Sequence, residues 1–281
     1  MLNDAFGKDS ALTKDWGYAA LVEAAGKRVL FDTGNHGDVL VRNAEILGFD
    51  LASIDFAVMS HRHGDHMGGL AHLLRLKPDV EIFAPVDGFG VYGFELPATF
   101  ARVDESLPSY ERYFDGRREG TWKMGSAWPG ADFRLIDRTT PIAPEMTLIA
   151  LVSDKPGTRE LRELSLAIDT PEGIVLVVGC SHPGIDNIVE AASSVNPKIH
   201  AIAGGLHLLA APDPEIDHLI KTLRETYGVE YIAPGHCTGE PALSALKESF
   251  GANYLYAGVG STVLFGARPG TAPRSPTRSK P

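Results

Sequence analysis

Short apolar runs, separated by turns rich in glycine and polar residues, recur along most of the chain. Wholly apolar runs of this length are typical of strands buried on both faces, and apolar residues spaced three or four apart are typical of helices. The pattern predicts strands at 18–24, 28–32, 54–59, 80–84, 146–152, 164–169, 174–178, 199–203, 231–233 and 259–265. It predicts helices at 38–48, 69–76, 185–193, 213–227 and 241–250. Glycine and proline turns predict one hairpin around Gly26 and another around 171–173.

The region from about residue 85 to residue 144 departs from this pattern. It is rich in glycine, proline and aromatic residues, namely Phe89, Tyr92, Phe94, Phe100, Tyr110, Tyr113, Phe114, Trp122 and Trp128. A segment of this length is usually a lid, a binding loop or an inserted subdomain. Its aromatic side chains are expected either to pack the insertion onto the body or to line an apolar substrate pocket, and the two roles are compatible.

The remaining pattern predicts a single domain over residues 1–265 that carries this irregular insertion at about 85–144. With 281 residues, of which 44% are apolar and 22% charged, the chain is long enough to bury a large core. The tail, 266–281, is rich in proline, serine and arginine and is predicted to be disordered.

Charge and hydropathy narrow the class of partner. The net charge of −10 argues against a nucleic-acid-binding surface, which normally carries a basic patch. No apolar run reaches the roughly 18 residues of a membrane span, and residues 1–10 lack the apolar core of a signal peptide. We therefore expect a cytoplasmic protein that acts on a small molecule, or an exported one if a signal was removed. The pattern does not indicate an oligomeric state, because the aromatic insertion is equally suited to a dimer surface.

The densest chemistry lies at residues 60–66, Ser-His-Arg-His-Gly-Asp-His, directly after the apolar run 56–59. Imidazole and carboxylate groups are common ligands of divalent metals. His61 and His63 are two residues apart, so in an extended backbone both project to one side and can share an ion. Gly64 lets the chain turn, after which Asp65 and His66 can face a second ion. This stretch predicts a metal site.

The same arrangement recurs later in the chain. Four times a short apolar strand runs into a glycine-flanked histidine, at His61, His182, His207 and His236. Sites in sheets with covered faces collect where strands end, so we expect these histidines to converge on one site. Asp32, at the end of the predicted strand 28–32, is interpreted as a carboxylate that orients a metal-binding histidine, with a buried cap as the alternative. The two cysteines, Cys180 and Cys237, each lie near one of these histidines and are interpreted as thiols at the site rather than a disulfide.

These residues resemble the metallo-β-lactamase superfamily. Its hallmark, His-x-His-x-Asp-His after a strand, is matched by residues 61–66, and the resemblance covers about residues 15 to 265. It implies an α+β fold, a four-layer αββα sandwich of two mixed sheets between helices, with a one- or two-metal site at one edge. Within the superfamily the chain is most similar to the dihydropteroate-synthase-like branch, also called 7,8-dihydropterin-6-yl-methyl-4-(β-D-ribofuranosyl)aminobenzene 5′-phosphate synthase-like. The segments that carry this similarity are 179–184, 204–208 and 236–239.

The resemblance implies two metal ions and a set of ligands for each. The expected ligands of the first ion are His61, His63 and His182. Those of the second ion are Asp65, His66 and His236. Where the best-known members carry a bridging aspartate, this chain has Cys180, which is expected either to bind metal as a thiolate or to be a small buried residue. His207 has no counterpart in the lactamases and is either a further ligand or a substrate-binding group.

The expected function is hydrolysis by a binuclear metal centre. Two divalent ions, zinc in the first place and iron or manganese as alternatives, can hold a water between them and lower its pKa to about 7, so that the resulting hydroxide attacks the substrate. Asp65 is expected to orient that hydroxide, and His207 to stabilise an oxyanion or protonate a leaving group. The expected substrate is a small-molecule ester, phosphoester, lactone or lactam. The alternatives are a pterin-pathway synthase, a di-iron redox enzyme and a non-catalytic metal-binding sensor.

Overall fold

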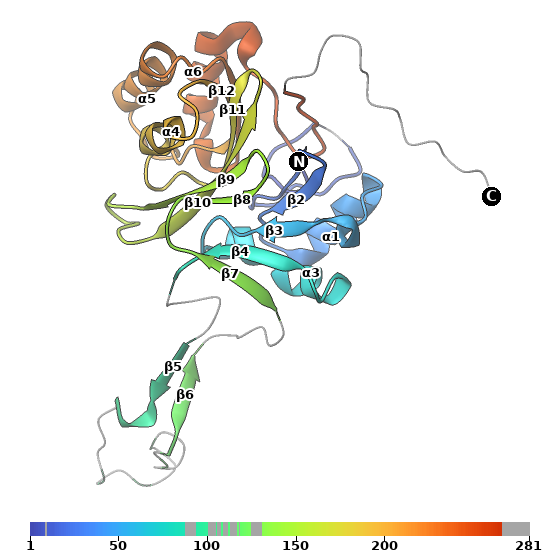
Figure 1. Ribbon diagram of the computed structural model, residues 1–281, viewed down its shortest axis with the longest axis vertical. Coiled ribbons are helices and arrows are strands. Elements are labelled where there is room, and N and C mark those ends of the chain that lie inside the picture. Colours follow the sequence, from blue (N-terminus) through green and yellow to red (C-terminus); the bar gives the residue numbers. More distant parts are fainter. Residues whose placement is uncertain are drawn as a thin grey trace, which may run out of the picture.

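Two mixed β-sheets lie face to face, and helices cover their outer faces (Figure 1). The structure is a computed structural model that describes residues 1–8, 10–87, 94–100, 119–124 and 131–265, with four single positions between 105 and 117. Within these residues one sheet has 5 strands and the other 6. The four-layer αββα sandwich expected from the sequence is therefore confirmed.

The first sheet comes from the N-terminal half of the chain. Its strands, in spatial order, are β1 (Ala20–Ala24), β2 (Lys27–Phe31), β3 (Phe56–Val58), β4 (Glu81–Pro85) and β7 (Asp132–Ile136). β1 and β2 form the predicted hairpin, and the pairings from β2 to β7 are parallel. Parallel neighbours need crossovers. The helices α1 (Gly37–Ile46) and α3 (Leu70–Leu76) provide those from β2 to β3 and from β3 to β4, and they cover the outer face.

The second sheet comes from the C-terminal half. Its strands, in spatial order, are β13 (Tyr231–Gly235), β12 (Ile199–Gly205), β11 (Gly173–Val178), β10 (Arg162–Thr170), β9 (Met146–Val152) and β8 (Thr140–Ala143). β8 to β11 are antiparallel, whereas β11, β12 and β13 run parallel. Its outer helices are α4 (Ile185–Ser193), α5 (Asp213–Lys221) and α6 (Glu240–Phe250).

β11 shows why the core strands read as continuous apolar runs. All its residues are buried. Val175 and Val177 face the other sheet, while Ile174 and Leu176 face the helices. Because successive side chains point to opposite faces, a strand between a sheet and a helix layer must be apolar at every position.

Three sequence predictions differ from the structure. Residues 259–265 form no strand, because the chain turns at Gly260 (φ 80°) and bonds to the N-terminal segment through Val259 N–H and the Phe6 carbonyl. The helix predicted at 213–227 leaves α-helical geometry after Lys221 and continues as a π-helical turn, Thr222–Thr226. No strands were predicted between 85 and 144, yet β7 and β8 are edge strands of the two sheets, and β5 (Phe94–Pro97) pairs with β6 (Thr121–Met124).

Much of the aromatic insertion and the tail 266–281 lie outside the described residues, so the predictions made for them stay predictions. Among the described residues, no helix has both the length and the apolar character needed to cross a membrane.

The functional residues lie at the edge of the sandwich where strands of both sheets end. The motif 60–66 follows β3, and the later histidines follow β11, β12 and β13, which are parallel neighbours.

Candidate metal centre

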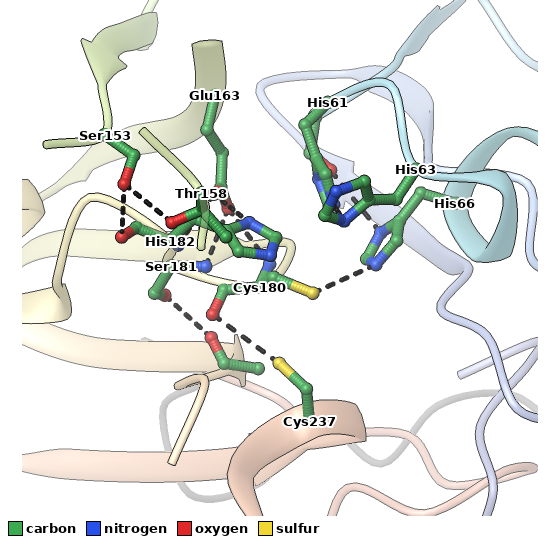
Figure 2. Close-up of polar contacts among 12 residues, drawn as sticks. His61, His63, His66, Ser153, Thr158, Glu163, Cys180, Ser181, His182 and Cys237 are labelled. Carbon is green, nitrogen blue, oxygen red and sulfur yellow. Dashed lines mark hydrogen bonds and ion pairs between the residues drawn. The ribbon is translucent and has the colours of Figure 1, made fainter. Parts of the chain in front are cut away.

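The motif 60–66 presents its side chains to the second sheet. His61 and His63 precede the short helix α2 (Gly64–Met67), with His63 in extended conformation, and His66 lies within that helix. His61 Nε2 is 3.1 Å from His63 Nδ1, so the two rings converge as their spacing predicted. Figure 2 shows these three histidines facing Cys180 and His182 across the gap between the sheets.

The first group of possible ligands is His61, His63 and His182. Each offers one donor atom, and these atoms lie within 4.8 Å of one another. Their ring centroids are 4.6 to 4.8 Å apart. This is the set expected from the sequence for the first ion.

The second group is Asp65, His66 and His236, again with donor atoms within 4.8 Å. The Nε2 atoms of His66 and His236 are 3.1 Å apart, and His236 Nε2 is 3.4 Å from Asp65 Oδ2. The structure thus brings together both triplets that the resemblance implied.

Cys180 lies between the two groups. Its sulfur is 3.1 Å from His66 Nε2 and belongs to one donor group with His61 and His66 and to another with His182 and His207. A thiol is therefore present where the superfamily resemblance placed a bridging ligand. The position suits a thiolate ligand as well as it suits a small buried residue.

The outer hydrogen bonds orient the rings toward a metal. His66 Nδ1 is 2.7 Å from the buried carboxylate of Asp32, as the sequence analysis expected for that residue. Ser60 Oγ donates to Asp32 Oδ2 and can therefore accept from His61 Nδ1, which is 2.8 Å away. In both histidines Nδ1 is occupied, so the lone pair of Nε2 is available to the centre. Metal-ligating histidines in proteins adopt this arrangement, so these residues fit a metal site.

Glu163, on β10, orients a histidine of the second sheet as Asp32 orients His66. The sequence did not predict this role for Glu163. Its Oε2 is 2.9 Å from His182 Nδ1 and also accepts the backbone N–H of His182, and Oε1 accepts the N–H groups of Cys180 and Ser181. Burial alone would raise the pKa of this carboxyl, but the hydrogen bonds, led by that of His182, hold its pKa below the ordinary value. The signal in the sequence was a carboxylate near the start of a strand in which residues 163–168 are all buried.

Asp4 is the second residue that sequence reasoning missed. It is completely buried, and Oδ2 accepts the backbone N–H of His236 at 3.0 Å while Oδ1 accepts that of Ala5. Burial raises the pKa of Asp4 to about 6. The N-terminal segment thus fixes the backbone of the last histidine, and no pattern around Asp4 indicated this.

Several of these residues hold strained backbone conformations. Asp32, Ser181, His207 and His236 have positive φ values of 59°, 66°, 53° and 47°. In non-glycine residues such conformations cost about 1–3 kcal/mol each and persist only where the surroundings fix them, most often at functional sites. Here the bonds that Glu163 and Asp4 accept from Ser181 and His236 supply that constraint.

The electrostatics favour a cation. Burial lowers the pKa of His61 well below its ordinary value, and the neighbouring histidines lower it further, which favours the uncharged ring. Burial opposes ionisation of Asp65, but the hydrogen bond and charge of His236 together with His66 hold its pKa well below the usual range. Imidazole nitrogens, a carboxylate and a thiol form a donor set suited to zinc or iron.

His207 lies at the solvent side of this cluster. It is exposed, unlike His61, His66 and His182, and its ring centroid is 4.3 Å from that of His182. A hydrogen bond with Cys237 raises the pKa of His207. The structure therefore brings His207 to the site, at a position that is open to a substrate.

Comparisons with known proteins agree with this geometry. A family model of the metallo-β-lactamase superfamily matches residues 15–236. The chain is 30% identical to a 7,8-dihydropterin-6-methyl-4-(β-D-ribofuranosyl)-aminobenzene-5′-phosphate synthase of Methanocaldococcus jannaschii, over 94% of this chain and 95% of the relative. Tm1679, a solved structure described as a metal-dependent hydrolase of the β-lactamase superfamily, is 29% identical with a TM-score of 0.67, over 92% of this chain and 95% of that one. The resemblance inferred from residues 61–66 is confirmed, and the chain belongs to the metallo-β-lactamase superfamily.

Proposed function

We propose that this protein is an enzyme with a binuclear metal centre and that it hydrolyses a small-molecule ester, phosphoester, lactone or lactam. In this proposal one ion is held by His61, His63 and His182. The other is held by Asp65, His66 and His236. Cys180 contributes its thiolate between them. Zinc is the first choice for both ions, with iron or manganese as alternatives.

One observation carries the proposal. Two three-residue donor groups, each with its atoms within 4.8 Å, face each other with a thiol between them. Buried carboxylates orient one histidine in each group, His66 through Asp32 and His182 through Glu163. An ion pair or a structural histidine cluster needs no such convergence of donor atoms from two sheets.

The residues of the chain then have distinct tasks. Bound divalent ions supply Lewis acidity, which lowers the pKa of a water and polarises a carbonyl or phosphoryl oxygen. Asp65, whose side chain is 23% exposed, can accept a hydrogen bond from an attacking water and orient it. His207, exposed at the rim, can donate a proton to a leaving group or a hydrogen bond to a developing oxyanion.

The test combines metal content with activity. The protein is purified without added metal, and zinc, iron and manganese are measured per chain by elemental analysis. Hydrolysis is then assayed with phosphodiesters, phosphomonoesters, lactones and β-lactams. We expect close to two ions per chain and turnover that is lost in Asp65→Asn but kept in His218→Ala, which removes an exposed histidine of α5. A protein that binds no metal even when metal is added would contradict the proposal.

A second candidate is a synthase of the pterin pathway. It is supported by the match to the Methanocaldococcus jannaschii synthase, which extends over nearly the whole of both chains. The two candidates share the metal centre and differ in whether the reaction joins two molecules or adds water. Incubating the metal-loaded protein with the dihydropterin and aminobenzene halves of that relative's named product, and seeking the joined compound by mass spectrometry, separates them. A joined product with no hydrolysis of the ester and lactam panel would favour the synthase.

A further inference from the structure

Two thiols face each other next to the metal centre. Cys180 follows β11, Cys237 lies in the turn that follows β13, and the sequence contains no other cysteine. Both are free, and each is only 3% exposed. Their sulfur atoms lie within 4.8 Å of one another, and the Cys237 thiol donates to the carbonyl oxygen of Cys180 at 3.5 Å (Figure 2).

The backbone holds this pair together. Gly205, at the end of β12, lies between the two cysteines, and a Cβ there would be 2.7 Å from Cys237 Sγ and 3.4 Å from Cys180 Cα. Only glycine therefore lets the thiols approach. Gly205 N–H donates to the Gly179 carbonyl, and Leu208 N–H donates to that of Cys237. Three neighbouring strands thus fix the relative position of the two thiols.

The pair is also connected to the metal ligands. Cys180 Sγ is 3.1 Å from His66 Nε2, and Cys237 forms a donor group with Cys180 and His236. A covalent bond between the sulfur atoms would therefore draw the Cys180 sulfur, and with it a donor atom, away from the histidines.

We propose that Cys180 and Cys237 are an oxidation site, at which a peroxide converts the two thiols to a disulfide and thereby lowers the metal occupancy of the centre. The inference rests on the proposed function in one respect, namely that Cys180 binds metal. The Cys180 sulfur lies within 4.8 Å of a donor atom of the exposed His207, so the buried pair is close to the solvent side of the site.

The chemistry balances with a peroxide as the oxidant. One thiol sulfur attacks a peroxide oxygen, so an S–O bond forms, the O–O bond breaks and water leaves, which gives a sulfenic acid. The second thiol attacks that sulfur, so the S–S bond forms, the S–O bond breaks and a second water leaves. The two sulfur atoms together lose two electrons, which reduce the peroxide. An external dithiol reverses the change by thiol–disulfide exchange.

The test reads mass and metal rather than activity. The metal-loaded protein is treated with hydrogen peroxide, its remaining thiols are alkylated under denaturing conditions, and intact mass and metal content are measured. We expect a loss of about 2 Da, no alkylated cysteine and a fall from two ions to about one per chain, all reversed by dithiothreitol with added metal. Cys237→Ser, with Cys237→Ala as a second variant if the first misfolds by circular dichroism, should show no such loss of mass.

Two results would overturn the inference. In one, the treated wild-type protein keeps both alkylatable thiols or gains oxygen without losing hydrogen. In the other, the disulfide forms but the metal content stays the same, which would break the connection to the centre. Because no substrate enters the measurement, a failed search for hydrolysis does not affect it.

Discussion

The two halves of the candidate metal centre are built in different ways. One half is a continuous segment, residues 60–66, that follows a single strand. The other half is assembled from the ends of β11, β12 and β13, which bring Cys180, His182, His207 and His236 together from distant parts of the sequence. Yet both halves rely on a buried carboxylate from another strand, Asp32 of the loop after β2 for the first and Glu163 of β10 for the second.

The continuous half depends on other parts of the fold for its orientation. Ser60 is held by Asp32 through its backbone N–H and its hydroxyl, and its carbonyl accepts the N–H of Leu164 in the opposite sheet. Gly179 makes this approach of the sheets possible, since a Cβ there would be 2.3 Å from Ser60 Oγ. A compact motif supplies ligand atoms, but the fold as a whole supplies their orientation.

The largest effect on metal content and turnover is expected when one proposed ligand is removed from either half. In the proposed centre, His61→Ala and His182→Ala each leave the first ion with two of its three histidines. The two variants should therefore lose metal and activity to the same extent, although the residues come from different halves. We expect each variant to lose about one ion per chain and to lower turnover by more than about 100-fold. Elemental analysis and the hydrolysis assay measure these changes.

His218→Ala is the matched control, because it removes an exposed histidine and should leave both quantities unchanged. If His61→Ala lost metal while His182→Ala kept both ions and full activity, the second half would not belong to the centre, and the site would be a property of the motif alone.

The next largest effect is expected when either orienting carboxylate, Glu163 or Asp32, is replaced by its amide. Glu163→Gln replaces a carboxylate that accepts four hydrogen bonds with an amide whose NH₂ group must face N–H donors. We expect metal affinity to fall by about 10- to 100-fold and the free energy of unfolding to fall by about 1–3 kcal/mol. Asp32→Asn should match it in metal affinity, because Asp32 likewise accepts from Ser60 and contacts His66. Metal titration and urea unfolding would measure both, and an unchanged affinity in Glu163→Gln would contradict the orienting role.

For the continuous half, the sequence was sufficient to predict which side chains lie close together. The spacing of His61 and His63 predicted that the two side chains converge, and wholly apolar runs such as 174–178 predicted strands covered on both faces. The ends of β11, β12 and β13 were also predictable, because each apolar run is followed within four residues by glycine and then by a histidine. Strand ends of parallel neighbours meet at one edge, so a one-dimensional pattern was enough to gather them.

The features that the sequence did not predict depend on contacts between segments that are far apart along the chain. Glu163 and Asp4 act through hydrogen bonds to the backbone of residues 180–182 and 236, and nothing in their own neighbourhoods shows those partners. The apolar run 259–265 failed as a strand for the same reason. Its hydrogen bonds go to Met1 and Phe6 near the N-terminus rather than to a sheet edge, so composition alone could not place it.

A smaller effect on metal affinity is expected at Asp4, because its carboxylate supports only the backbone N–H of one histidine, His236. In Asp4→Asn the amide oxygen can still accept one N–H, but the NH₂ group must then face the other donor, either His236 or Ala5. In the proposed centre only the second ion depends on His236, so the affinity for that ion should fall by about 10-fold while the first ion stays bound. Competitive titration with a metal chelator separates the two ions. Equal loss of both would show that Asp4 supports the fold rather than His236.

The smallest effect should come from the motif itself, at Gly64. The sequence suggested that glycine is needed there for a turn, but Gly64 has no positive φ, begins α2, and has no atom within 4 Å of an added Cβ. Gly64→Ala should keep both ions and raise the free energy of unfolding by up to about 1 kcal/mol, because alanine restricts the unfolded chain. Gly205→Ala in the other half should instead lower it by about 1–3 kcal/mol, since its Cβ would meet the Gly179 carbonyl at 2.5 Å. Metal analysis and urea unfolding of the pair measure this contrast. If Gly64→Ala lost metal, the path of the motif would depend on glycine, and the continuous half would be as tightly constrained as the assembled one.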